Sequence, residues 1–294
     1  MLTKETVVLV QGMTGKEGTR ASELMIESGI TLSAGVTPGK GGQEVHGKPI
    51  FNSVQEAKEH DPAINTSVLY VPPLFVYGAA MEAMDAGIEL LIIISENVPV
   101  QDTAKLIEHA RTNGKRVIGP ASIGIMNTAL GKIGSIGFPG QNEAYSKGNI
   151  GIISKSGGMS GETANILTQA GLGQSTVVGI GGDMLIGTTF TDVLDYFEQD
   201  EGTAAVVMFG EFGGRYEQHV AQHVHEKKFT KPVIAFIGGQ FAETLNRSLA
   251  LGHAGAIVDK ENTANAKKRI LQDAGVLVAD YHYQIPELVQ EALQ

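Results

Sequence analysis

The stretch Val7-Val8-Leu9-Val10-Gln11-Gly12-Met13-Thr14-Gly15-Lys16-Glu17-Gly18 indicates the fold class of this chain. Its leading apolar residues are typical of a buried strand, the glycines predict a turn, and residues 19–28 have the pattern of a helix. Two residues separate each pair of glycines, which differs from the dinucleotide fingerprint G-x-G-x-x-G. The turn therefore favours an anion at the helix N-terminus over NAD, although a tight turn without a ligand would have the same sequence.

Strands and helices alternate along the rest of the chain. Strand patterns lie at 31–36, 67–71, 89–94, 116–118, 150–154, 176–180, 204–209, 232–237 and 276–278, and helix patterns lie at 75–86, 101–113, 163–170, 190–199, 216–227, 263–273 and 286–293. This rhythm predicts an α/β protein with parallel sheets, at whose carboxyl ends the loops meet. Periodicity fades in the middle, so we expect a first domain at 1–128, a linker at 129–147 and a second domain at 148–294.

The composition limits the partners and the chemistry. The chain of 294 residues has 22 Lys and Arg against 32 Asp and Glu, a formal charge of −10, so nucleic acid and anionic membranes are not expected as partners. It has no cysteine, which excludes disulfides, thiolate metal sites and a thiol nucleophile. No long apolar run and no basic leader is present, so we expect a cytoplasmic or organelle-matrix location.

A glycine-rich loop follows the strand pattern at 31–36. It reads Thr37-Pro38-Gly39-Lys40-Gly41-Gly42 and places one cation on a flexible frame, so Lys40 is a candidate partner for a phosphate group. The loop is not a Walker A motif, because the four residues between glycines and the Ser or Thr after the lysine are both missing. No other stretch of the sequence supplies that motif.

The main candidate for chemistry is a histidine among small residues, Gly252-His253-Ala254-Gly255-Ala256. A ring without bulky neighbours is open to a phosphate group. Glu211 ends an apolar strand pattern within Gly210-Glu211-Phe212-Gly213-Gly214, and a carboxylate there could orient an imidazole by accepting its ring N–H. The plainer alternatives are a histidine in a tight turn and a solvated loop acid.

The strand pattern at 150–154 continues into Lys155-Ser156-Gly157-Gly158-Met159-Ser160-Gly161-Glu162. The hydroxyl and N–H groups of this stretch could surround an anion at the start of a helix. Glu162 stands where the nucleophile elbow G-x-S-x-G has its second glycine, which disfavours a serine hydrolase.

Three histidines, His219, His223 and His225, lie on or near one predicted helix. The first two are four residues apart, so a zinc site is conceivable. The acid of the H-E-x-x-H motif is missing between them, and we therefore expect no metal site. The helix at 263–273 is predicted to have a charged face.

Together these clusters resemble, over nearly the whole chain, the α subunit of succinyl-CoA synthetase, within the ADP-forming acyl-CoA synthetases, and the matching region of ATP-citrate lyase. Five motifs match in order: the first glycine turn and the stretches at 36–42, 179–183, 210–214 and 252–256. The resemblance implies a Rossmann-like CoA-binding domain followed by a flavodoxin-like domain that carries a phosphohistidine.

The resemblance also implies roles for individual residues. His253 would carry the phosphoryl group, and Glu211 would orient it. We expect the remaining contacts to fall in two sets, a CoA set of Thr14, Gly15, Lys16, Gly18, Val36, Lys40, Ile94, Ser95 and Glu96, and a phosphate or substrate set of Ser156, Gly157, Gly158 and Ser160.

Two departures from the family pattern concern the substrate. The succinate enzymes have S-G-T-L-T-Y-E with a tyrosine near the substrate, whereas this chain has Gly161 at that place. The family's G-P-N-C-P-G reads Gly119-Pro120-Ala121-Ser122-Ile123-Gly124, which looks more like the citrate branch. Because a missing ring frees volume, we expect a citrate-like or other substituted carboxylate rather than simply succinate.

The implied reaction is an acid–CoA ligation in three steps. Nucleotide and carboxylate give an acyl phosphate, with the phosphoryl group passing through His253, and the CoA thiol then attacks the activated carbonyl and displaces phosphate. The sequence has no recognisable nucleotide-phosphate loop, so the resemblance implies that an ATP-grasp β partner binds ATP or GTP and Mg²⁺. Two alternatives are a non-catalytic CoA-binding sensor of the same fold and a Rossmann oxidoreductase, which the spacing of the first turn disfavours.

Overall fold

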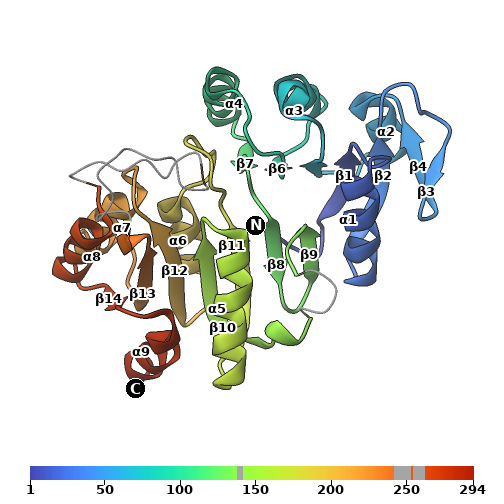
Figure 1. Cartoon of the computed structure of the whole chain (residues 1–294). Helices are drawn as coiled ribbons and strands as arrows, with labels where there is room; N and C mark the ends of the chain where they lie inside the picture. Colours follow the sequence, from blue (N-terminus) through green and yellow to red (C-terminus); the bar gives the residue numbers. More distant parts are fainter. Residues whose placement is uncertain (138–141, 242–252, 254–261) are drawn as a thin grey trace.

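The computed structural model describes residues 1–137, 142–241, 253 and 262–294. These residues form two seven-stranded sheets with helices packed against them (Figure 1). Among them, no helix is both long enough and apolar enough to cross a bilayer. The expected α/β class is confirmed.

The first sheet has the strand order β3-β4-β2-β1-β5-β6-β7. All of its pairs are parallel except β3 with β4. The chain moves from β1 to β2 on one side and later to β5 on the other, so the order reverses between β1 and β5. The strands span Val7–Gln11 (β1), Thr31–Val36 (β2), Glu44–Val45 (β3), Lys48–Phe51 (β4), Thr66–Leu69 (β5), Leu90–Ile93 (β6) and Arg116–Ile118 (β7).

Helices cover both faces of this sheet, because alternate residues of β1 belong to different apolar clusters. Val8 and Val10 pack in the cluster that includes α1, whereas Leu9 packs in the cluster of α2, α3 and α4. Figure 1 shows α1 on the side of the sheet opposite α3 and α4. The elements span Lys16–Glu27 (α1), Val54–His60 (α2), Pro73–Phe75 (η1), Val76–Asp85 (α3) and Val100–Thr112 (α4).

The second sheet has the order β14-β13-β12-β10-β11-β8-β9. The five strands from β10 to β14 are parallel to one another. The chain adds β11 on one side of β10 and then β12, β13 and β14 on the other side, which is the flavodoxin-like strand order. The strands β8 and β9 form an antiparallel hairpin that pairs with β11. The strands span Gly124–Asn127 (β8), Gly131–Gly134 (β9), Lys147–Ser154 (β10), Gln174–Gly179 (β11), Ala205–Glu211 (β12), Val233–Gly238 (β13) and Leu277–Ala279 (β14).

The helices of the second half divide between two apolar clusters. Residues of α5 and α9 pack together in one, and residues of α6, α7 and α8 pack in the other, which also contains residues of α1 and β1. The core is therefore continuous between the two sheets. The elements span Asn142–Ala144 (η2), Gly157–Gln169 (α5), Phe190–Gln199 (α6), Tyr216–His225 (α7), Ala264–Asp273 (α8), His282–Gln284 (η4) and Ile285–Ala292 (α9).

Three features differ from the sequence-based expectation. The hairpin of β8 and β9, which was not predicted, belongs to the second sheet, and the last strand of the first sheet ends at Ile118. Gly124, Gly131 and Gly134 have positive φ, and so many glycines weaken a strand pattern. The element α2 and the β3–β4 pair were not predicted, and α5 starts at Gly157 instead of residue 163.

The segment after β7 joins the carboxyl ends of the two sheets. Ala121 N–H donates to the Ser95 carbonyl at 2.9 Å, beside the first sheet. The Ser122 hydroxyl donates to the Gly179 carbonyl at 2.5 Å, at the end of β11. The loops that follow the strands of both sheets therefore lie at a common junction, where ligands bind in folds of this kind.

Candidate functional site

A pocket of about 660 Å³ lies at the point where the strand order of the first sheet reverses. We call it the β1–β5 pocket, since residues at the ends of β1 and β5 contribute to it. It is lined by Gln11, Gly12, Thr14, Gly15, Val36, Thr37, Pro38, Lys40, Tyr70, Val71, Pro72, Leu74, Phe75, Gly78, Ala79 and Glu82.

The backbone of the first turn approaches β5 closely at this pocket. A Cβ at Gly12 would lie 2.7 Å from the Tyr70 carbonyl oxygen, and Gly12 has a φ of +82°. Gly15 N–H donates to the Gly12 carbonyl at 3.0 Å, which closes the turn just before α1. The turn thus brings main-chain N–H groups at a helix N-terminus against the pocket, a setting that favours an anion.

The predicted CoA residues divide into three groups. Thr14, Gly15, Val36 and Lys40 line the β1–β5 pocket. Lys16 and Gly18 do not line it: a Cβ at Gly18 would lie 2.3 Å from the Gly12 carbonyl oxygen, so this glycine permits the packing of α1.

The third group, residues 94–96, reaches a second cavity instead. Ile94 and Glu96 line that cavity, and the Ser95 hydroxyl donates at 2.5 Å to the carbonyl of Val71, a residue of the β1–β5 pocket. This segment therefore connects the two hollows.

The sequence reasoning missed the apolar rim of the β1–β5 pocket. Leu74 and Phe75 in η1 are 77% and 66% exposed although both are large and apolar. The signal was present, because two large apolar residues directly follow Pro72-Pro73 in a loop after a strand. Such side chains at the edge of a pocket are suited to contact with a flat or apolar part of a ligand.

The second cavity, of about 410 Å³, contains His253, and we call it the histidine cavity. Residues from the ends of both sheets form it, so it lies at the junction of the two halves. Its lining is Ile94, Glu96, Asn97, Ala121, Ser122, Ile123, Ser135, Lys155, Ser156, Gly157, Gly158, Gly182, Asp183 and His253.

Glu211 and His253 are in direct contact, as the sequence led us to expect. The Glu211 Oε2 atom lies 2.7 Å from Nδ1 of His253, and its Oε1 atom lies 2.7 Å from Nζ of Lys155. Glu211 ends β12 and Lys155 follows β10, so the pair lies where the order of the second sheet reverses. A carboxylate that accepts from Nδ1–H leaves the Nε2 lone pair free as a nucleophile.

Charge and burial set the protonation of this group. Burial opposes ionisation of Glu211, but the hydrogen bond to His253 and the charge of Lys155 bring its pKa below the ordinary value. The hydrogen bond to Glu211 raises the pKa of His253 above 6.5, against the opposing effects of burial and Lys155. Glu211 is therefore held as an anion that favours a donating ring.

The N-terminus of α5 faces the same cavity. Ser156 is the N-cap, and its hydroxyl oxygen accepts the Met159 N–H at 3.4 Å, which explains why the helix begins earlier than predicted. Ser156, Gly157 and Gly158 line the cavity together with His253. Ser160 does not line it, because its hydroxyl is buried and donates to the Gly157 carbonyl at 2.7 Å.

The ring of His253 packs against a glycine. A Cβ at Gly182 would lie 2.5 Å from Cδ2 of His253, so only glycine leaves room for the ring. The next residue, Asp183, is buried, and burial raises the pKa of its carboxyl group. Lys155 and Asp183 were not among the predicted site residues, although both follow strand patterns beside glycines.

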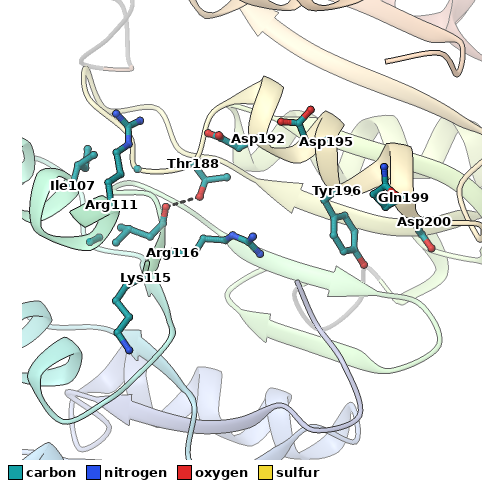
Figure 2. Close-up of a pocket in the computed structure, with 13 residues that line it drawn as sticks. Ile107, Arg111, Lys115, Arg116, Thr188, Asp192, Asp195, Tyr196, Gln199 and Asp200 are labelled. Carbon is teal, nitrogen blue, oxygen red and sulfur yellow. Dashed lines mark hydrogen bonds between the residues drawn. The ribbon is translucent and has the colours of Figure 1, made fainter. Parts of the chain in front are cut away.

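A third cavity, of about 590 Å³, lies between the end of α4 with β7 and the helix α6 (Figure 2). Arg111, Lys115 and Arg116 line one side and acidic residues of α6 line the other, while the Thr188 hydroxyl donates to the Val117 carbonyl at 2.6 Å. None of the predicted site residues lines this cavity, so it is not part of the candidate active site.

The histidines of α7 lie elsewhere. Nε2 of His223 is 2.8 Å from a carboxylate oxygen of Asp195 in α6. Within the residues that the structure describes, no group of three or more His, Cys, Asp or Glu side chains is arranged to hold a metal ion.

Comparison with known proteins defines the class of the chain. Residues 3–97 match the model of the CoA-binding domain, and residues 153–290 match the model of the CoA-ligase domain. The chain therefore combines a CoA-binding domain with a CoA-ligase domain that follows it.

The curated relatives carry the name of one ligase subunit. The chain is 44% identical over 281 residues to the succinate–CoA ligase [ADP-forming] subunit alpha of Methanothermobacter thermautotrophicus, covering 95% of this chain and 92% of that one. It is 42% identical to the corresponding subunit of Aquifex aeolicus, covering 100% of this chain and 94% of that one. The chain therefore belongs to the succinate–CoA ligase α-subunit family.

A solved structure of similar fold comes from another enzyme. The ATP citrate lyase of Methanosaeta concilii, a D541A mutant in complex with (3S)-citryl-CoA, superposes with a TM-score of 0.91 at 28% identity. The match covers 98% of this chain and 50% of that one, so this chain spans about half the length of the lyase chain.

Proposed function

We propose that this chain is the α subunit of a nucleoside-diphosphate-forming acid–CoA ligase in which His253 carries the phosphoryl group. The observation that carries the proposal is the contact between Glu211 and Nδ1 of His253 in a cavity that the N-terminus of α5 also faces. The contact holds the ring so that Nε2 can attack phosphorus, and the helix N-terminus can stabilise the negative charge that arrives.

Two features of the site match the needs of phosphoryl transfer. By accepting the Nδ1–H, Glu211 makes Nε2 a better nucleophile, and it can stabilise the cation that forms when Nε2 binds phosphorus. Lys155, only 2% exposed and 2.7 Å from Glu211, keeps that carboxylate ionised despite its burial. The residues of this chain therefore orient the nucleophile and hold its proton at a defined atom.

We propose the β1–β5 pocket as the CoA site. Its volume, its apolar rim of Leu74 and Phe75, and the cation of Lys40 fit a ligand that combines a ring, an apolar arm and phosphate groups. Bound CoA would supply the thiol that attacks the activated carbonyl. The segment of Ile94, Ser95 and Glu96 leads from this pocket to the histidine cavity, which is the path such an arm would need.

The nucleotide and its metal are assigned to a partner. The subunit name of the relatives refers to an assembly with more than one kind of chain. Since the sequence contains no Walker A motif, we propose that an ATP-grasp β subunit binds ATP or GTP with Mg²⁺ and delivers phosphate to His253. Labelling of His253 should therefore require both chains.

For the acyl substrate we propose a citrate-like or other substituted carboxylate, with succinate as the competing candidate. Gly161 in place of a tyrosine supports the larger substrate, and so does the fold shared with ATP citrate lyase. The identity to succinate–CoA ligase subunits supports succinate. Release of phosphate in the presence of CoA, measured for citrate, succinate and malate at equal concentrations, decides between them.

The phosphoryl carrier is tested by labelling. The chain with its partner, γ-labelled ATP and Mg²⁺ should take up phosphate that is acid-labile and base-stable, and His253→Asn should abolish the label. His223→Asn is the matched control, because the same change is made on α7 outside the histidine cavity. His223→Asn should keep the label, and label retained in His253→Asn would refute the assignment.

The same experiment addresses the alternative of a CoA-binding sensor. A sensor would bind CoA with the affinity of an enzyme but take up no phosphate from any nucleotide. The intact Glu211–His253 contact favours the enzyme, because a binding protein has no need of an oriented nucleophile.

A further inference from the structure

A buried ion pair lies behind Glu211, outside the histidine cavity. Lys267 of α8 and Glu217 of α7 are both 0% exposed, and Nζ of Lys267 contacts Oε2 of Glu217. Neither residue lines any of the three cavities described above. Two full charges without contact to water are costly, so their position needs a reason.

The pair is bonded to the main chain of Glu211 on both sides. The Glu211 N–H donates to Oε1 of Glu217 at 3.1 Å, and Nζ of Lys267 donates to the Glu211 carbonyl at 2.8 Å. Lys267 also donates to the carbonyl of Gly213. Both polar atoms of the Glu211 peptide backbone are therefore fixed by charged side chains from two helices.

The sequence makes room for this arrangement. A Cβ at Gly210 would lie 2.7 Å from Oε1 of Glu217, so glycine is needed directly before Glu211 for the carboxylate to reach its N–H. Gly213 and Gly214 have positive φ, which turns the chain back towards α7. Gly213 N–H donates to the Asn262 carbonyl at 2.8 Å, just before α8 begins.

We propose that Lys267 and Glu217 are positioning residues, which hold the backbone of Glu211 so that its carboxylate meets Nδ1 of His253. This inference rests on the proposed function, because it assigns the pair to the orientation of the phosphoryl carrier. The ordinary alternative is a pair that only stabilises the fold. The bonds to both backbone atoms of Glu211 favour positioning, since the strength of the Glu211–His253 contact depends on where that backbone lies.

The variants remove charge without leaving one ion alone. Lys267→Met or Glu217→Gln by itself leaves an unpaired buried charge and can prevent folding, so the double variant Lys267→Met/Glu217→Gln is the principal test. Lys268→Met is the matched control. Lys268 is the adjacent residue of α8, is only 5% exposed, and pairs with Asp280 at 3.4 Å instead of with the Glu211 backbone.

Two measurements separate positioning from stability. The first is the pKa of His253 from NMR titration of the histidine-labelled full chain, with its signal assigned by His253→Asn. Among the described residues, the charged groups that face the ring are Glu211, Lys155, Glu96 and Asp183, and the variants alter none of them. The second is the rate at which the assembly with its partner, nucleotide and Mg²⁺ labels His253.

If the pair positions Glu211, the double variant should label roughly tenfold to a hundredfold more slowly, and the pKa of His253 should move down towards 6.5. Lys268→Met should change neither. A double variant that melts at a lower temperature but keeps the wild-type pKa and labelling rate overturns the inference. If wild-type chain takes up no phosphate, the proposed function fails, and the pKa measurement still decides whether the pair positions Glu211.

Discussion

Two strand-to-helix turns of this chain are both rich in glycine, but different interactions hold them in place. The turn after β1 is held by main-chain contacts, with Gly12 N–H bonded to the Val36 carbonyl at 2.8 Å and no room for a Cβ at Gly12. The turn after β12 is held by charges, since Lys155, Lys267 and Glu217 all contact Glu211. The first arrangement suits binding of an anion by N–H groups, and the second suits control of a reactive side chain.

The largest change in the labelling rate of His253 is expected when the negative charge of Glu211, in the turn after β12, is removed. Glu211→Gln replaces the carboxylate by an amide and leaves Lys155 buried beside a neutral group. We expect labelling of His253 to slow by up to about ten-thousandfold, as when the acid that orients a catalytic histidine is replaced by its amide. The Kd for CoA, measured by calorimetry, should not change. Equal loss of CoA binding would mean that the two turns are not separate in function.

The pH dependence of labelling shows how much of that effect is electrostatic. Attack on phosphorus needs the neutral ring, and the hydrogen bond to Glu211 raises the pKa of His253 above 6.5. The wild-type rate should therefore fall as the pH is lowered through this raised pKa. In Glu211→Gln the carboxylate that raises the pKa of His253 is absent, so the labelling rate should fall at a lower pH than in the wild type. Rapid-quench rates over the range in which histidine titrates give the comparison, and a fall at higher pH in the variant reverses the assignment.

The next largest change, in stability and in affinity for CoA, is expected when a side chain is added to Gly12 in the turn after β1. Gly12→Ala puts a Cβ 2.7 Å from the Tyr70 carbonyl oxygen at a φ of +82°. The free energy of unfolding should fall by about 3 kcal/mol, from the left-handed backbone and the overlap together. Affinity for CoA should also fall. Gly29→Ala is the control, because Gly29 has a φ of +93° but no atom within 4 Å of the added carbon.

Urea unfolding of the two glycine variants gives the measurement. A loss in Gly29→Ala as large as that in Gly12→Ala would show that backbone conformation alone, without the close approach to β5, accounts for the effect.

A smaller effect is expected from a cation of the β1–β5 pocket. Lys40→Ala should weaken CoA binding by about 1–3 kcal/mol, as for a hydrogen bond to a charged group. Lys16→Ala should weaken it less, because Lys16 does not line the pocket. Calorimetry at two salt concentrations checks both. If Lys16→Ala has the larger effect, the phosphates of CoA lie at the start of α1 rather than at Lys40.

The smallest effect is expected at Ser160. Ser160→Ala removes a buried hydroxyl that donates to the Gly157 carbonyl, so stability should fall by about 1 kcal/mol while the labelling rate stays within twofold. Ser156→Ala should lower stability by a similar amount, since it removes the N-cap, but should also slow labelling because Ser156 lines the histidine cavity. Equal labelling rates in both variants would contradict this difference.

The regular elements were predictable where the pattern is local. The strands Thr31–Val36 and Arg116–Ile118 agree with the expected limits, because each is a short apolar run between turn residues. The hairpin β8–β9 was missed because its glycines hide the pattern, and the helix α5 was placed too late because glycines fill its first turn.

The structure places the expected site residues in more than one cavity. Four of the nine expected CoA residues line the β1–β5 pocket, and two others line the histidine cavity instead. The helix α8 was read as having a charged face, but Lys267 and Lys268 lie on its buried side. A sequence pattern places lysine on the exposed face of a helix. Burial of Lys267 is stable because the carboxylate of Glu217 is buried beside it.

The sequence by itself determined the α/β class, the glycine turns at the strand ends, and the family, because these follow from residues close together in the chain. The tertiary structure decided that Glu211, 42 residues before His253, accepts the ring N–H, and that Lys267, 56 residues after Glu211, fixes its backbone. Such contacts depend on which strand ends and helices meet when the sheets assemble. Their consequences, a raised pKa at His253 and a buried ion pair, come from low exposure to water and short distances between charges, which no local pattern encodes.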